Sequence, residues 1–126
     1  MDKNHKKALL RLADKLLGEG AYKKIGPVPK HKFWMSYWFA TKKGGTGVSQ
    51  YSFDPIKCKT SACAVGWAMS DPWFKKRGLN FIHDCGEVFG LDAEDLFMPH
   101  TYNDKPSAAT VAARIRSFVF FEDHKN

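Results

Sequence analysis

The stretch CKTSACAVGWAMSDP, residues 58–72, is the most unusual part of the chain, and an extended segment is predicted to become a helix within it. Small residues lie on both sides of Trp67, so a neighbouring element can approach closely while the indole fills the adjacent gap. Thr60 or Ser61 is predicted to cap a helix that runs to about Ser70, where the sequence Ser-Asp-Pro ends it. Tight core packing is therefore the favoured interpretation of the cysteines in this stretch.

The N-terminal half predicts a long helix followed by extended chain. Residues 4–17 have apolar side chains at helical spacing, with Asn4 as the cap, Gly18 as the end, and the Lys and Arg side chains off the apolar stripe. Two aromatic-rich segments, residues 33–40 and 47–53, are separated by a glycine-rich turn, which predicts a β-hairpin.

The C-terminal half predicts further helices over residues 81–89 and 92–97, and a last one that starts near Pro106 and carries Val111, Ile115 and Phe118 on one face. The predicted fold class is α+β. Residues 1–126 are expected to form a single, mainly helical domain of about five helices with a small aromatic-rich β-hairpin.

Composition places the chain among cytoplasmic proteins. It has no apolar run near the ~20 residues that cross a bilayer, and its basic N-terminus lacks the features of a signal peptide. Three cysteines in 126 residues predict reduced thiols rather than a disulfide framework. No membrane association is expected.

Charge is divided unevenly along the chain. Residues 1–60 hold thirteen Lys or Arg against four Asp or Glu, a net charge of +9, whereas residues 61–126 hold seven against nine, a net charge of −2. This asymmetry indicates a surface that attracts anions. The predicted electrostatic contacts are Lys23, Lys24, Lys30, Lys32, Lys42 and Lys43. Trp34 or Tyr37 is predicted to be an exposed aromatic anchor beside them.

Two other classes of function remain open. In a cysteine-dependent enzyme, Cys58 would be the nucleophile and His83 or His100 its base. A nucleic-acid-binding protein would use the basic, aromatic segment around residues 23–39, although no known binding motif is visible. A metal site is not favoured, because the spacing of the candidate ligands does not match structural zinc, and no cofactor is predicted. These candidate ligands are Cys58, Cys63, His83 and Cys85.

The block CKTSACAVGWA resembles the Cys-Gly-Thr-x-x-Cys-x-x-Gly-Trp-Ala block of a family of small bacteriophage and bacterial proteins. The segments LLRLADKL, FGLDAEDLFMP and AATVAARIRSF extend the resemblance over most of the chain. The family usually has glycine where this chain has Lys59. The positions that match best are Cys58, Thr60, Cys63, Gly66, Trp67 and Ala68.

The resemblance implies a phage or mobile-element context and transfers no activity. Small accessory proteins of that context act by binding, for example by blocking a host defence protein or sequestering a nucleotide. The expected function is therefore that of a phage-type accessory protein in the host cytoplasm that acts by binding, with the cysteine-dependent enzyme as the alternative. Its basic half would bind an acidic host-protein surface or a phosphate-bearing ligand. The sequence leaves the oligomeric state open.

Overall fold

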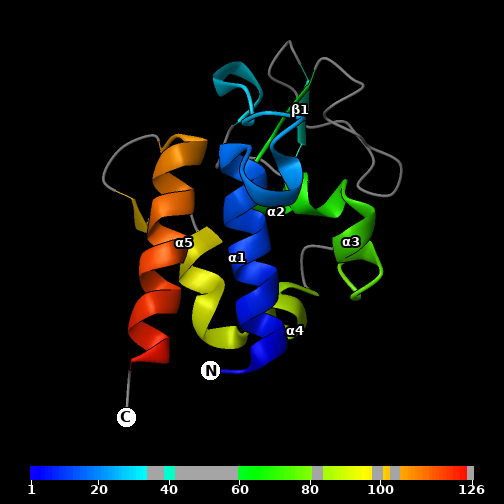
Figure 1. Ribbon diagram of the computed structural model, residues 1–126. Coiled ribbons are helices and arrows are strands. Elements are labelled where there is room, and N and C mark those ends of the chain that lie inside the picture. The colour runs from blue at the N-terminus through cyan, green and yellow to red at the C-terminus, as the bar shows by residue number, and fades with distance from the viewer. Residues whose placement is uncertain (34–38, 42–59, 81–83, 98–100, 103–105, 125–126) are drawn as a thin grey trace.

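The computed structural model describes residues 1–33, 39–41, 60–80, 84–97, 101–102 and 106–124. The α-helices in these ranges are α1 (Lys3–Leu17), α2 (Ala64–Met69), α3 (Pro72–Lys75), α4 (Cys85–Phe89) and α5 (Ala108–Asp123). Short 3-10 helices accompany them, namely η1 (Gly20–Tyr22), η2 (Lys30–Lys32) and η4 (Leu91–Phe97). The described part of the chain is mostly helical, and α1 and α5 are its long elements (Figure 1).

Helix α1 forms where the apolar spacing predicts it, but a different residue caps it. The Asp2 carboxylate accepts hydrogen bonds from the backbone N–H groups of Asn4 and His5, at 2.7 and 3.1 Å. Asp2, and not the predicted Asn4, is therefore the N-cap of α1. The predicted cap at Asn4 is wrong, because Asn4 already lies within the helix. Gly18 ends the helix as predicted, in a left-handed conformation with a φ of 67°.

Helices α1 and α5 lie side by side and run in opposite directions, so both chain ends lie at the same end of the pair (Figure 1). Polar contacts fix this arrangement along its length. An ion pair joins Lys6 to Asp123 near the chain ends. Further along, Arg116 contacts Asp14 at 2.9 Å and Glu19 at 2.8 Å.

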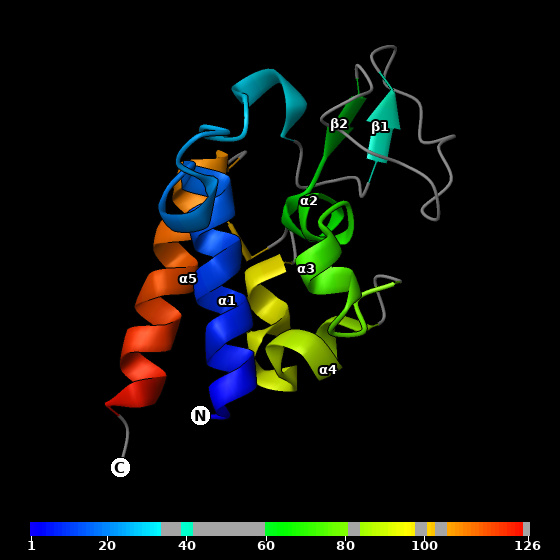
Figure 2. The ribbon, with the colours of Figure 1, turned by 45° about the vertical axis from the view of Figure 1, so that its right-hand side comes forward.

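The hydrophobic core lies between this helix pair and the shorter helices, which lie across α1 from α5 (Figure 2). Phe74 of α3 and Phe89 of α4 are fully buried, with ring centroids 5.9 Å apart. The predicted apolar faces of both long helices are confirmed, apart from Phe118, which is only half-buried. Their fully buried members are Leu9, Leu12, Ala13, Leu16, Val111, Ala112 and Ile115.

The predicted α+β class is wrong, because the described residues are mostly helical and no β-hairpin is shown among them. Residues 34–38 and 47–53 lie outside the described residues. The described strands, β1 (Phe39–Thr41) and β2 (Thr60–Ala62), pair antiparallel over only three residues each. This is shorter than the ~5–6 residues of a typical strand, and it adds a small appendage to a helical core (Figure 2).

The beginning of α2 also differs from the prediction. Thr60 and Ser61 belong to β2, so their backbone is extended and pairs with β1 instead of capping a helix. Cys63 occupies the capping position, and its side chain makes no capping hydrogen bond. The joint between extended chain and helix therefore lies about one helical turn later than Thr60 and Ser61 predict.

Candidate functional site

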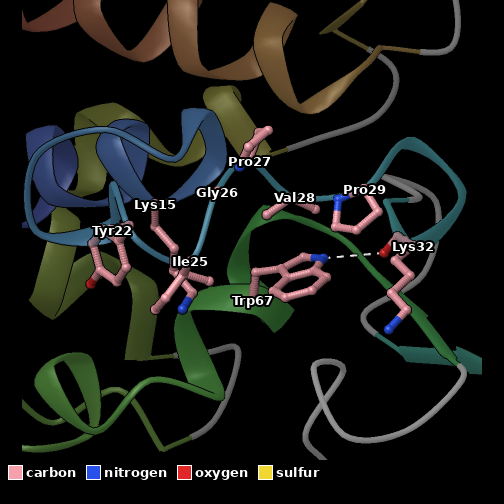
Figure 3. A pocket seen from close by; sticks show the side chains of 9 residues that line it. All are labelled: Lys15, Tyr22, Ile25, Gly26, Pro27, Val28, Pro29, Lys32 and Trp67. Carbon is pink, nitrogen blue, oxygen red and sulfur yellow. Dashed lines mark hydrogen bonds between the residues drawn. The ribbon is translucent and has the colours of Figure 1, made fainter.

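A pocket of about 140 Å³ opens between the end of α1, the loop that follows η1, and Trp67 of α2 (Figure 3). Its walls are mainly the side chains of branched aliphatic residues and prolines together with the indole ring. Two lysines, Lys15 and Lys32, also line it. The lining residues are Lys15, Tyr22, Ile25, Gly26, Pro27, Val28, Pro29, Lys32 and Trp67.

The loop that forms one wall is held against the end of α1. The Val28 N–H donates to the Leu16 carbonyl at 3.1 Å, and the Gly26 N–H donates to the Tyr22 carbonyl at 3.0 Å. A Cβ atom added to Gly18 would lie 2.2 Å from the carbonyl carbon of Gly26. The pocket wall therefore depends on a glycine at the end of α1, both for its positive φ and for the close approach of two backbones.

Trp67 forms the opposite wall and ties two elements together. Its side chain is buried, and its indole Nε1–H donates to the Lys32 carbonyl at 3.1 Å (Figure 3). This bond connects α2 to η2 and satisfies the one polar atom of the indole. The edge of the ring stays available to the pocket.

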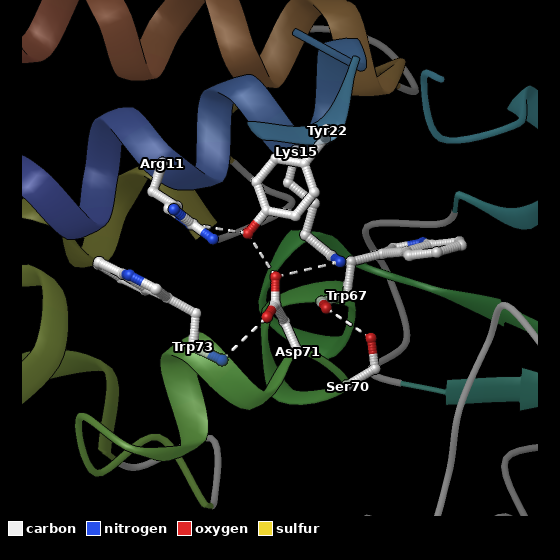
Figure 4. Close-up of polar contacts among 7 residues, drawn as sticks. All are labelled: Arg11, Lys15, Tyr22, Trp67, Ser70, Asp71 and Trp73. Atoms are coloured by element: carbon white, nitrogen blue, oxygen red, sulfur yellow. Dashed lines mark hydrogen bonds and ion pairs between the residues drawn. The ribbon is translucent and has the colours of Figure 1, made fainter. Parts of the chain in front are cut away.

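A buried polar network lies beneath the pocket, between α1, η1 and the start of α3 (Figure 4). The Asp71 carboxylate accepts a short hydrogen bond from the Tyr22 hydroxyl and lies 3.4 Å from the Lys15 amine. Its other oxygen accepts from the Trp73 N–H at 2.9 Å and so caps α3. Lys15 and Asp71 are only 6% and 8% exposed, which makes this a largely buried ion pair.

Helical spacing places Lys15 off the apolar stripe of α1, where an exposed side chain is expected. In the structure the Lys15 side chain is buried. It is 6% exposed, and its amine lies 4.9 Å from the centre of the Tyr22 ring. In the sequence, Asp71 is predicted only to help end α2, as part of the Ser-Asp-Pro segment. An Asp-Pro pair is typical of the start of a helix and indicates the cap of α3. No local pattern indicates that Asp71 pairs with Lys15, which is fifty-six residues away in the sequence.

The network shifts the titration of both of its acids. Burial raises the pKa of Tyr22 to about 12, and the hydrogen bond to Asp71 adds to the effect. Burial alone would raise the pKa of Asp71 as well. Hydrogen bonds from Tyr22 and the Trp73 N–H and the charge of Lys15 outweigh burial, so the pKa of Asp71 lies below its ordinary value.

Arginines surround the outer side of the network. The Arg11 Nε–H donates to the Tyr22 hydroxyl at 2.9 Å, and the guanidinium lies 4.8 Å from the centre of the Trp73 ring. Arg77 covers the same ring at 3.5 Å. These cation–π contacts hold both guanidinium groups against the indole ring of Trp73, next to the network.

The predicted binding lysines divide into two groups. Lys23, Lys24 and Lys30 are exposed on the loop around the pocket, and Lys32 is half-buried in its wall. The structure thus brings part of the predicted basic surface together with a pocket that sequence analysis did not anticipate. The other predicted contacts, Trp34, Tyr37, Lys42 and Lys43, lie outside the described residues.

The cysteines that the structure describes are core residues, which confirms the packing interpretation for Cys63. Cys63 and Cys85 are 3% and 8% exposed. Burial raises the pKa of Cys85 to about 12, and burial also raises the pKa of Cys63 although nearby backbone N–H groups act against it. Cys58, His83 and His100 lie outside the described residues, so the cysteine-enzyme hypothesis stays a prediction.

Alkylation with iodoacetamide at neutral pH is expected to spare Cys63 and Cys85 in the folded protein. A rise in pKa from 9.0 to about 12 lowers the thiolate fraction of Cys85 about a thousandfold, and thiolate is the form that reacts. Peptide mass mapping after labelling, with and without guanidinium, measures this at each site. Equal labelling of either cysteine in both conditions would contradict the buried, protonated thiols of the structure.

Within the described ranges, no group of three or more His, Cys, Asp or Glu side chains lies where it could hold a metal ion. Among the helices of these ranges, none combines the length and hydropathy needed to span a membrane. Comparison with known proteins gives no matching family model, no matching curated protein and no matching solved structure.

Proposed function

We propose that this protein acts by binding an acidic segment of another protein through the loop around the Trp67 pocket. The observation that carries this proposal is the position of the pocket inside the basic loop. Lys23 and Lys24 come just before the loop residues that line the cavity and Lys30 just after them, so exposed lysines flank an apolar cavity along one loop. An apolar side chain of the partner would fill the cavity while its acidic neighbours contact Lys23, Lys24 and Lys30.

The size and lining of the pocket favour a protein partner over a phosphate-bearing ligand. A cavity of about 150 Å³ with apolar walls holds a group the size of benzene, which is the size of one apolar side chain. The exposed lysines are spaced along the loop, before and after the residues that line the cavity, which suits several carboxylates better than one phosphate.

On the resemblance of residues 58–68, the partner is a host protein and this chain is a phage-type accessory protein that blocks it. Binding as the mode of action is supported by the pocket and the basic loop. The host and the defence role rest on the resemblance alone. The nucleic-acid hypothesis stays a prediction, and it requires an affinity that falls steeply as salt increases.

Reversing the charge of Lys23 and Lys24 together is expected to weaken binding of an acidic peptide with one central leucine by about tenfold or more. Each exposed ion pair is worth about 0.2–1 kcal/mol, and reversal replaces attraction with repulsion. Fluorescence anisotropy of the labelled peptide measures the change. The same peptide with alanine in place of leucine should also bind less tightly, because it leaves the pocket unfilled.

The matched control is Lys75→Glu with Lys76→Glu, which makes the same change in net charge at exposed positions on and next to α3. This control should keep its affinity within about twofold, since charges more than ~8 Å apart are screened at physiological salt. The proposal would be wrong if both double variants lost affinity equally. Tighter competition by inorganic triphosphate than by the unlabelled peptide would point to a phosphate ligand instead.

A further inference from the structure

A second, larger pocket of about 580 Å³ lies at the opposite end of α1. It is formed by the beginning of α1, by the segment from α4 into η4, and by the end of α5. A 15-residue helix is about 22 Å long. This pocket and the Trp67 pocket are therefore separated by roughly the length of α1, so the loop at the Trp67 pocket cannot reach the second pocket of the same molecule.

The walls of this second pocket are apolar. Leu91 is 75% exposed and lies over Gly86, where an added Cβ atom would come within 2.7 Å of its side chain. Phe89 and Ala93 lie beneath, and Phe118 closes the side formed by α5. Leu91 therefore contributes exposed apolar surface beside the cavity, which the rest of the described residues leave largely uncovered.

The rim of this second pocket is acidic, in contrast to the chain as a whole. Carboxylates contribute four of its lining residues, and the Met1 amino group and His5 lie beside them. His5 is itself hydrogen-bonded to the Glu87 carbonyl at 3.0 Å. The carboxylates are those of Asp2, Glu87, Asp92 and Glu122. The chemistry that fits is an apolar side chain flanked by cations.

The same chain presents that chemistry at its other end. Ile25 is 65% exposed and directly follows the exposed Lys23 and Lys24. We infer that the Lys23–Ile25 loop of one molecule docks into the acidic pocket of a second copy. Leu91 of the receiving copy would pack against Ile25, while Glu87 and Asp92 face the lysines.

This contact joins different surfaces of the two copies, so it leaves one free loop and one free pocket at the ends of every pair. Such head-to-tail association continues to longer chains or closes into a ring. The net charge of +7 opposes it at low salt, but repulsion between distant charges is screened beyond ~8 Å at physiological salt. Since the loop is also the proposed partner-binding surface, self-association and partner binding compete.

A charge-swap experiment tests the docking. One variant carries Lys23→Glu and Lys24→Glu, and the other carries Glu87→Lys and Asp92→Lys, all at exposed positions. In sedimentation velocity at physiological salt, the wild type should form concentration-dependent larger species. Each variant alone should associate at least tenfold more weakly, while an equal mixture should regain association, because each loop then meets a pocket of opposite charge.

Net charge cannot produce this rescue. The first variant carries +3 and the second +11, four units either side of +7, so the two repel each other overall. Lys75→Glu with Lys76→Glu has the same net charge as the first variant but keeps both the loop and the acidic pocket, so it should self-associate as the wild type does. A wild type that stays a single protomer at every concentration, or a mixture that does not associate, would overturn the inference.

The result also separates this inference from the proposed function. The Glu87→Lys, Asp92→Lys variant keeps the basic loop, so it should bind the acidic peptide as tightly as the wild type or better. If that variant associates normally and still binds the peptide, only the docking is wrong. Should the pocket substitutions disturb folding, Leu91→Ser at a 75% exposed position gives a second variant, which should weaken association without a charge change.

Discussion

Replacing Asp71 with alanine is expected to lower the free energy of unfolding by about 3 kcal/mol. The change leaves the Lys15 amine buried without its carboxylate partner and the Tyr22 hydroxyl without its acceptor. It also removes the side chain that caps α3 through the Trp73 N–H. Urea denaturation followed by circular dichroism measures the loss, and the slope with urea should stay unchanged.

A matched variant separates the ion pair from the cap. Asp71→Asn keeps a capping oxygen but removes the charge, so it should cost less than Asp71→Ala. A double-mutant cycle with Lys15→Met then isolates the coupling between the two charges. A loss below about 1 kcal/mol for Asp71→Ala would be typical of an exposed ion pair, and it would contradict the buried network of Figure 4.

The network also sets a pH window for its own contribution to stability. The pKa of Asp71 lies below its ordinary 3.8, so this contribution is present above about pH 4 and is lost as the pH falls through the lower, folded-state pKa. The pKa of Tyr22 is raised from 10.0 to about 12, so its contribution is present below pH 10 and is lost between pH 10 and 12. Asp71→Ala should remove the acid side of this profile and reduce the alkaline side only in part, because burial is the main cause of the raised pKa of Tyr22.

The second large effect is expected at the end of α1. Gly18→Ala should lower the free energy of unfolding by about 2–5 kcal/mol, because a left-handed non-glycine residue costs about 1–2 kcal/mol and an overpacked contact about 1–3 kcal/mol. The new Cβ atom would meet the backbone of Gly26 and Pro27 at 2.2 Å. The loop must then move away from α1, so binding of the acidic peptide should fall as well.

Gly78→Ala is the control for the conformational part of this effect. Gly78 also has a positive φ, of 98°, but a Cβ atom there would have no neighbour within 4 Å. The difference between the two variants in thermal or urea denaturation is therefore the cost of the clash. Equal losses at both positions would show that the loop does not press against Gly18, and the pocket wall would then need another explanation.

The local sequence was sufficient for the two long helices. Leu9, Leu12 and Leu16 recur at helical spacing and are all buried, because one face of an amphipathic helix must turn to the core wherever that helix packs. Gly18 ended α1 as predicted, since a left-handed end favours glycine in any context. Local chemistry decides these features.

Short segments were predicted less well, because their conformation depends on partners distant in sequence. Thr60 and Ser61 have the side chains of helix caps, yet pairing with residues 39–41 draws their backbone into β2. Cap propensity amounts to about 1 kcal/mol, and a few backbone hydrogen bonds to another segment outweigh it.

The sequence by itself determined that this chain is basic in its first half, carries two long amphipathic helices and buries small residues around Trp67. Only the tertiary structure placed Lys15 against Asp71, closed the loop onto Gly18 and so made a pocket beside the exposed lysines. The reason is the separation in sequence between the residues that form each feature. The apolar face of a helix is formed by residues three and four apart, so the local sequence reveals it. A buried ion pair or a cavity wall joins residues that are distant in sequence, and their sequence separation does not predict their distance in space.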